Sequence, residues 1–343
     1  MQLFKKQVDI ILQPSNEELK KEIQRLKEKL SVTIVAHFYQ RDEVFEVGDI
    51  TGDSLELAKK TRDDDAEFVL FCGVGFMGQS VKVLSPHKRV VMPKVAECAM
   101  ASMINGTQFD EAVKALNSAG ISNENILPIT YINSDVVVKA KVGEMGGMVC
   151  TSSNAKTIIT TALKEGKKIL FVPDRCLGQN IANEMGLKSA VIGDGRDIAA
   201  ADIVCYDGFC SVHQLFSVED IEFFRNKYPG ILVATHPECD PAVCQASDFV
   251  GSTSQLIKYI KELPAEQKVV VGTEFNMVNR LRPNNTYVLS STKPECPTMN
   301  ETTLQDVYAT LKAIEDGSPI NEIFVDETTQ KWAKIALERM MAL

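Results

Sequence analysis

Three of the nine cysteines stand at corresponding places in the sequence, and thiols placed in this way could hold a metal centre. Cys98, Cys210 and Cys296 each precede a Ser/Thr-x-x-Asp pattern by seven to nine residues. The pattern is typical of capped helix starts and begins at Thr107, Ser217 and Thr303. Thiolates bind soft and borderline metals, and three protein sulfurs leave a further metal position open to substrate. The pattern therefore predicts that these thiols converge on one metal-cluster site.

Two other interpretations of the cysteines stay open. A free cysteine is among the most buried residue types, so any single one is more often a core residue than a ligand. A zinc site is the second alternative, although the spacings Cys205-x4-Cys210 and Cys239-x4-Cys244 lack the tight C-x2-C pairs of zinc ribbons. The threefold occurrence favours a cluster site over both.

Polar side chains end three β-rich runs, at residues 32–40, 126–134 and 231–239. These side chains belong to His37, Tyr39, Tyr131, Asn133, His236 and Glu238. Each histidine stands two residues before a hydroxyl or carboxylate group, so on an extended strand both side chains face the same way. Such groups supply acid–base chemistry and bind carboxylates. We expect one composite cleft, with His213 nearby in a role left open.

Small residues fill turns that precede helices, and such turns hold anions. Residues 73–78 match the GxGxxG dinucleotide fingerprint, but Ser85-Pro86 cuts the following helix short. The turns taken as equivalent read Thr151-Ser-Ser-Asn and Gly251-Ser-Thr-Ser. Hydroxyls and backbone N–H groups at helix starts favour carboxylate or phosphate binding. We therefore expect Ser152 and Thr253 to hold anions, and a dinucleotide cofactor is the weaker alternative.

The elements that position these residues predict an α/β fold of three homologous α/β/α repeats. Each β-rich run leads to a second strand, turn and helix (68–84, 148–163, 249–260), and then to a third strand (89–94, 168–174, 269–274). We expect short parallel sheets around a pseudo-threefold axis, where equivalent loops meet. The expected units are a helical lead-in at 1–30, capped by Asn16, repeats at 31–110, 111–200 and 201–296, and a segment 297–343 packed back on the first repeat.

Composition narrows the functional classes. The 343-residue chain has a net charge of −9, so it lacks the basic excess of a nucleic-acid or anionic-membrane partner. It has no apolar stretch of about 18 residues that would span a membrane, and its N-terminus has no apolar signal core. An odd number of cysteines in a chain of this size argues against an extracellular disulfide framework. We expect a cytoplasmic enzyme with reduced thiols.

With these residues identified, the chain closely resembles the quinolinate synthase family from about residue 30 to 315. The resemblance is carried by the Cys98 loop and by the motifs AHFYQ, GDSLELAKK, TYINS, VCTSSNA, DGFCSVH, THPEC, VGSTSQ, GTEFNMVNRL and CPTMNETTLQD. It implies a triplicated α/β fold with one [4Fe-4S] cluster per chain on Cys98, Cys210 and Cys296. The fourth iron would have no protein ligand and would act as a Lewis acid.

The resemblance also implies an activity and a set of site residues. The family condenses iminoaspartate with dihydroxyacetone phosphate to quinolinate in NAD biosynthesis, with loss of phosphate and two waters. The motifs match a catalytic set of Tyr39, Glu238, His37, His236 and Tyr131. They match a substrate-binding set of His37, Ser54, Tyr131, Asn133, Ser152, His236, Glu238 and Thr253. Transient contact with L-aspartate oxidase, which makes the unstable imine, is expected.

Two local departures and two alternative functions accompany the resemblance. Phe38 stands where the family form AHNYQ has Asn, and we expect it to alter the pocket lining. Residues 141–150 are longer than the family pattern, so Ser152 is matched by motif and not by spacing. An aconitase-like [4Fe-4S] hydro-lyase and a non-enzymatic iron–sulfur sensor are the alternatives, because an open-iron cluster would look alike in all three.

Overall fold

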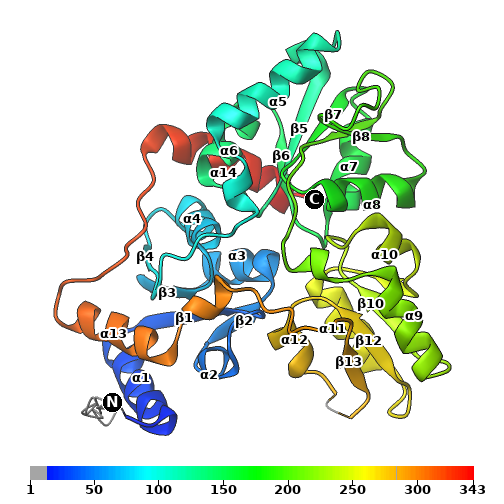
Figure 1. Ribbon diagram of the computed structural model, residues 1–343. Coiled ribbons are helices and arrows are strands. Elements are labelled where there is room, and N and C mark those ends of the chain that lie inside the picture. The colour runs from blue at the N-terminus through cyan, green and yellow to red at the C-terminus, as the bar shows by residue number, and fades with distance from the viewer. Residues whose placement is uncertain (1–13, 283) are drawn as a thin grey trace, which may run out of the picture.

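The computed structural model describes residues 14–282 and 284–343 and contains three parallel sheets set around a common centre (Figure 1). The strand orders are β2-β1-β3-β4, β6-β5-β7-β9-β8 and β11-β10-β12-β13. Every pair of neighbouring strands in these sheets is parallel. The prediction of an α/β fold with three short parallel sheets is confirmed. Residues 1–13 of the expected lead-in lie outside the described residues.

The elements follow one another in three similar groups. The first holds β1 (Val32–His37), α2 (Asp42–Phe45), β2 (Ile50–Gly52), α3 (Ser54–Arg62), β3 (Phe68–Cys72), α4 (Gly75–Leu84) and β4 (Arg89–Val91). The second holds α5 (Gly106–Ser118), β5 (Ile126–Tyr131), α6 (Val136–Glu144), β6 (Met148–Cys150), α7 (Ala155–Leu163), β7 (Lys168–Val172), α8 (Arg175–Met185), β8 (Ser189–Val191) and β9 (Ile203–Cys205). The third holds α9 (Val218–Lys227), β10 (Leu232–Thr235), α10 (Pro241–Gln245), β11 (Phe249–Val250), α11 (Thr253–Glu262), β12 (Val269–Gly272), α12 (Phe275–Asn279) and β13 (Thr286–Val288).

Strand pairing corrects which segments are equivalent. The central strands β1, β5 and β10 pair on one side with β2, β6 and β11, and on the other with β3, β7 and β12. Residues 68–84 therefore correspond to the segments that begin with β7 and β12, and the expected match to 148–163 and 249–260 was wrong. The true equivalent of β6 and β11 is β2, a strand of three residues that is too short to show a β pattern in the sequence.

The strand register shows which residues of the three groups are equivalent to one another. Ala36 pairs with Thr51, Thr130 with Val149, and Thr235 with Val250. Counting on from these pairs gives three triplets: His37, Tyr131 and His236; Tyr39, Asn133 and Glu238; and Ser54, Ser152 and Thr253. The nine polar residues of the expected site thus occupy three positions, each present once in every repeat.

The apolar core is continuous between the first two groups and divided from the third. One cluster of buried side chains runs from β1 and β3 through β5 and β7 to helix α14 (Glu327–Met341). The buried cores of the third group, on either side of β10 and β12, form separate clusters. Loops and polar contacts therefore carry much of the connection between the third group and the other two.

The two C-terminal helices pack on different groups. Helix α13 (Leu304–Glu315) buries Leu304, Val307 and Leu311 against α1 (Asn16–Leu30) beside the first sheet. Helix α14 packs against α6 and β6 of the second group (Figure 1). Ser15, and not Asn16, caps α1 through a capping box with Glu18. No helix among residues 14–282 and 284–343 is long and apolar enough to cross a membrane.

Candidate active site

One buried pocket at the centre of the three groups collects all of the expected site residues. It encloses about 70 Å³. Its lining includes the three triplets defined by strand register, together with Cys98, Cys210, Cys296 and His213. The carboxyl ends of parallel strands are the usual place for such a site, because the following helices point their N–H groups at it. The expectation of one composite cleft agrees with this geometry.

The three cysteines reach the pocket through loops built in the same way. Each cysteine is followed at the third residue by a short 3₁₀ turn, at Ala101–Met103, His213–Leu215 and Met299–Glu301. At the seventh residue stands a helix cap, Asn105, Ser217 or Thr303. The expected cap at Thr107 was wrong: Asn105 forms the capping box with Gln108. The true spacing is therefore constant, which ties the three thiols to equivalent positions.

The chemistry of these three thiols fits a metal centre. They are only partly buried, whereas the other six cysteines are buried. Burial in the pocket raises the pKa of Cys98 to about 12 and also raises the pKa values of Cys210 and Cys296. Negative charge on neighbouring thiolates adds to the shifts of Cys98 and Cys210. Three soft donors that repel one another as thiolates would be stabilised by a shared cation.

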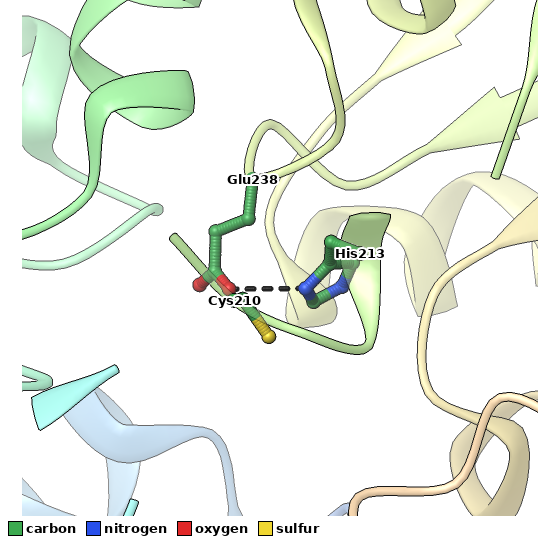
Figure 2. Close-up of side chains that lie close together, drawn as sticks. All are labelled: Cys210, His213 and Glu238. Carbon is green, nitrogen blue, oxygen red and sulfur yellow. Dashed lines mark ion pairs between the residues drawn. The ribbon is translucent and has the colours of Figure 1, made fainter. Parts of the chain in front are cut away.

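A chain of polar contacts crosses the pocket from Glu238 to Tyr39. His213 Nδ1 lies 3.0 Å from Glu238 Oε2 (Figure 2), an ion-pair distance at an angle that does not meet hydrogen-bond geometry. His213 Nε2 is 3.1 Å from Thr273 Oγ1, which is 3.1 Å from Tyr39 Oη. Tyr131 Oη donates to the other carboxylate oxygen of Glu238 at 2.6 Å. These contacts link groups from all three sheets.

Cys210 lies close to the polar contacts that run from Glu238 to Tyr39. Ligand atoms of Cys210, His213 and Glu238 all lie within 4.8 Å of one another (Figure 2). The acid–base groups of the pocket therefore adjoin the cysteine loops, and a substrate held beside the thiols would touch both.

Burial sets the protonation of the site residues. It lowers the pKa of His37 to about 4 and that of His236 to about 3, so both rings are neutral at pH 7. Burial also raises the pKa values of Tyr39 and Tyr131, which keeps both hydroxyls protonated. Burial would raise the pKa of Glu238 too, but His213 and His236 outweigh it and hold that pKa below its usual range. The pocket thus presents the Glu238 carboxylate beside neutral histidine and tyrosine donors.

Backbone hydrogen bonds fix the tautomers of the two equivalent histidines. His37 Nδ1 accepts from the N–H of Tyr39 at 3.1 Å, and His236 Nδ1 accepts from the N–H of Glu238 at 3.3 Å. A neutral ring whose Nδ1 accepts must carry its proton on Nε2. Both histidines therefore offer an Nε2–H donor, which suits a carboxylate or phosphate without adding charge.

The third triplet places hydroxyls at helix starts. Ser54 and Thr253 are the first residues of α3 and α11, and Ser152 lies in the turn before α7. All three line the pocket. Helix N-termini with free N–H groups favour anions. This agrees with the anion-holding turns expected from the sequence, although the first is the β2–α3 turn and not residues 73–78.

Sequence reasoning missed Thr273, Asp53 and Glu274, which lines the pocket and accepts from the N–H of Cys296. Thr273, at the end of β12, bridges His213 and Tyr39. Asp53 lines the pocket and caps α3. Phe38, expected to alter the lining, instead stacks on Phe45 at a centroid distance of 5.9 Å and lines no part of the described pocket. A rule that inspected every polar residue at a strand end would have found Thr273, but not Asp53, because β2 shows no strand pattern in the sequence.

Three parallel α/β groups that deliver thiols, acid–base groups and anion-holding turns to one buried pocket define an enzyme of triplicated α/β architecture. The family model described as Quinolinate synthetase A protein matches residues 21–342, and the chain belongs to this family.

Named relatives match along almost the whole chain. A quinolinate synthase of Helicobacter pylori (strain HPAG1) is 51% identical over 336 residues, covering 96% of this chain and 99% of the relative. A quinolinate synthase of Streptomyces coelicolor is 38% identical, covering 96% of this chain and 89% of the relative. One from Staphylococcus carnosus is 39% identical, covering 97% and 95%.

Proposed function

We propose that this chain is a quinolinate synthase that condenses iminoaspartate with dihydroxyacetone phosphate and releases phosphate and two waters. The observation that carries the proposal is the pocket in which three cysteines and three triplets of polar residues meet. Family membership and a relative 51% identical over 96% of the chain support it. The proposal includes a cytoplasmic location and transient contact with L-aspartate oxidase as the source of the unstable imine.

A [4Fe-4S] cluster on Cys98, Cys210 and Cys296 forms part of the proposal. The donor set supports it, because three partly buried thiols with raised pKa values adjoin one cavity. When bound, the cluster would supply a Lewis-acidic iron that polarises substrate oxygens.

The anionic substrates would be held by neutral donors. The Nε2–H groups of His37 and His236 would donate to carboxylate oxygens, and so would the amide of Asn133. Hydroxyls of Ser54, Ser152 and Thr253 line the same pocket and would complete the anion contacts at the helix starts. Neutral donors and helix dipoles can compensate substrate charge without placing additional buried cations in the site.

Glu238 and Tyr39 would carry the proton transfers. The Glu238 carboxylate is an acceptor suited to removing a proton from carbon or nitrogen, and Tyr39 is a protonated hydroxyl suited to donating to a leaving oxygen. His213 contacts Glu238 at 3.0 Å and is linked through Thr273 to Tyr39. A small rotation of the His213 ring that turned the 3.0 Å contact into a hydrogen bond would let a proton taken up at Glu238 be returned at Tyr39. Tyr131 would steady the Glu238 carboxylate through its 2.6 Å hydrogen bond.

The test is quinolinate formation by anaerobically purified, iron- and sulfide-reconstituted protein given both substrates together. We expect quinolinate and phosphate in equal amounts. A protein that takes up iron and sulfide but only hydrates or dehydrates a hydroxy acid would be the aconitase-like alternative. One that binds the cluster and turns over neither substrate set would be the sensor alternative.

A further inference from the structure

Four polar side chains from the three groups form one hydrogen-bonded cluster beside the pocket. The hydroxyls of Ser153 and Ser254 both donate to Asp53 Oδ2, that of Ser153 at 3.3 Å. Ser153 Oγ also lies 3.0 Å from Ser252 Oγ. Asp53 belongs to the first group, Ser153 to the second, and Ser252 and Ser254 to the third. This cluster therefore joins all three groups at one point.

Asp53 is held rigidly within the cluster. Its other carboxylate oxygen, Oδ1, accepts from the N–H groups of Leu55 and Glu56 at 3.1 and 3.0 Å as the cap of α3. The residue is 8% exposed. A carboxylate fixed by two backbone donors is a firm anchor for hydroxyls from other parts of the chain, and charge-assisted hydrogen bonds are the stronger kind.

The strand register explains why these four residues meet at the edge of the cavity. Ser54, Ser152 and Thr253 are equivalent by register and line the pocket. Asp53 and Ser252 stand one place before that position, and Ser153 and Ser254 one place after it. In each turn the middle residue is thus available to substrate, while its neighbours connect the turns.

The cluster stands in the wall between the pocket and the surface. Ser153 lines the buried pocket and also an open groove of about 590 Å³ between the second and third groups. Ser252 lines the same groove, together with Lys156, Asn180 and Gln255. The groove is lined by a mixture of polar and apolar side chains, and its Lys156 forms an ion pair of 2.5 Å with Glu184.

Among the described residues, the third group shares no buried core with the other two, although Phe38 and Tyr39 of the first group pack against one of its cores. The first two groups share one apolar core, while the cores of the third are separate. Hydrogen bonds between side chains must therefore contribute a large share of the cohesion where the third group meets the others.

We propose that Asp53 is a positioning residue that latches the three anion-holding turns together and closes the wall between the buried pocket and the groove. Opening the wall would let small dicarboxylates exchange between pocket and solvent through the groove. This inference concerns the wall and not the reaction, and it rests on the proposed function only for the choice of quinolinate as a probe.

The test changes the serines that donate to Asp53 and leaves Asp53 in place as the cap of α3. In the full-length reconstituted protein, the double variant Ser153→Ala/Ser254→Ala removes both donors to Asp53. Amide hydrogen exchange followed by mass spectrometry should become about tenfold faster at residues 151–155 and 251–255. The dissociation rate of quinolinate, measured by rapid dilution, should rise about tenfold, equivalent to about 1.4 kcal/mol. Ser118→Ala, an exposed serine on α5, is the matched control and should change neither rate.

Two further measurements separate a latch from general destabilisation. The double variant Ser153→Thr/Ser254→Thr restores both hydroxyls and should return both rates toward wild type. Exchange in the core strands β5 and β7 should stay unchanged in all variants. Unchanged exchange in both turns of the alanine variant would overturn the latch, and so would failure of the threonine variant to restore them. Faster exchange in a protein that makes no quinolinate would support the latch and contradict the proposed function.

Discussion

Removing the hydroxyl of Thr273 tests whether the contacts from Glu238 to Tyr39 carry protons. Thr273→Val keeps the shape of a fully buried side chain and deletes both 3.1 Å contacts, to His213 and to Tyr39. Thr273 stands outside the described lining of the pocket, so substrate binding should be preserved. General acid–base catalysis contributes about 10²–10⁴-fold, so kcat should fall about 10²-fold or more while KM changes little.

The control for this prediction is a second variant that loses a similar amount of stability. Tyr39 Oη keeps its 3.0 Å contact with Thr253, but His213 Nε2 loses its partner. This loss costs about 1–3 kcal/mol of unfolding free energy, which a 343-residue enzyme can lose and still fold. Thr235→Val removes an equally buried hydroxyl that contacts Ser247 at 2.9 Å and should cost similar stability without loss of kcat. The assay is quinolinate formation under anaerobic conditions beside thermal unfolding. A folded Thr273→Val protein with kcat within about threefold of wild type would refute the relay, because such a change is far below an acid–base effect.

Three further predictions follow from the same pocket. Glu238→Gln keeps an acceptor for Tyr131 but removes the carboxylate charge, so kcat should fall at least about 10²-fold. The control Glu219→Gln changes an exposed residue and should leave kcat unchanged. Equal turnover of both variants would remove Glu238 from the mechanism. Tyr39→Phe should lower kcat while leaving the [4Fe-4S] absorbance intact, and loss of the absorbance would show a structural role instead. His37 should contribute about 3 kcal/mol to the loss of stability in urea unfolding from pH 6.5 to 4, because the unfolded residue binds a proton there and the folded residue, with its pKa near 4, is only partly protonated. His236, with its pKa near 3, should add a similar loss. His37→Gln should therefore make the slope shallower by the His37 share without removing it, and His87→Gln should leave the slope unchanged.

Much of the site could be predicted from the sequence because its residues recur at constant spacing. The run of polar residues at three strand ends and the three cysteines before capped helices are local patterns, and repetition tells them apart from ordinary core residues. Asn105 shows the limit of this reasoning. It caps α5 as Ser217 caps α9, but the Ser/Thr-x-x-Asp pattern fits Thr107 and not Asn105. An asparagine cap followed by Gln fits the same physics but not that pattern.

Long-range contacts account for what the sequence did not reveal. Strand β2 has three residues and follows a four-residue helix, so local patterning gave no hint that its turn matches those after β6 and β11. Thr273 became a site residue only because β12 brings it within 3.1 Å of residues 60 and 234 positions away. Asp53 was not among the expected site residues, because only the fold brings its second carboxylate oxygen to serines of two other groups.

The central claim, that Cys98, Cys210 and Cys296 together hold one cluster in the catalytic pocket, is tested most directly by iron and sulfide analysis with a visible spectrum. Anaerobically reconstituted wild-type protein should contain about four irons and four sulfides per chain. Cys150→Ala, which changes a buried cysteine at the end of β6, should retain them. Cys296→Ala should lose the cluster and all quinolinate formation. An intact four-iron spectrum in Cys296→Ala protein would contradict the account.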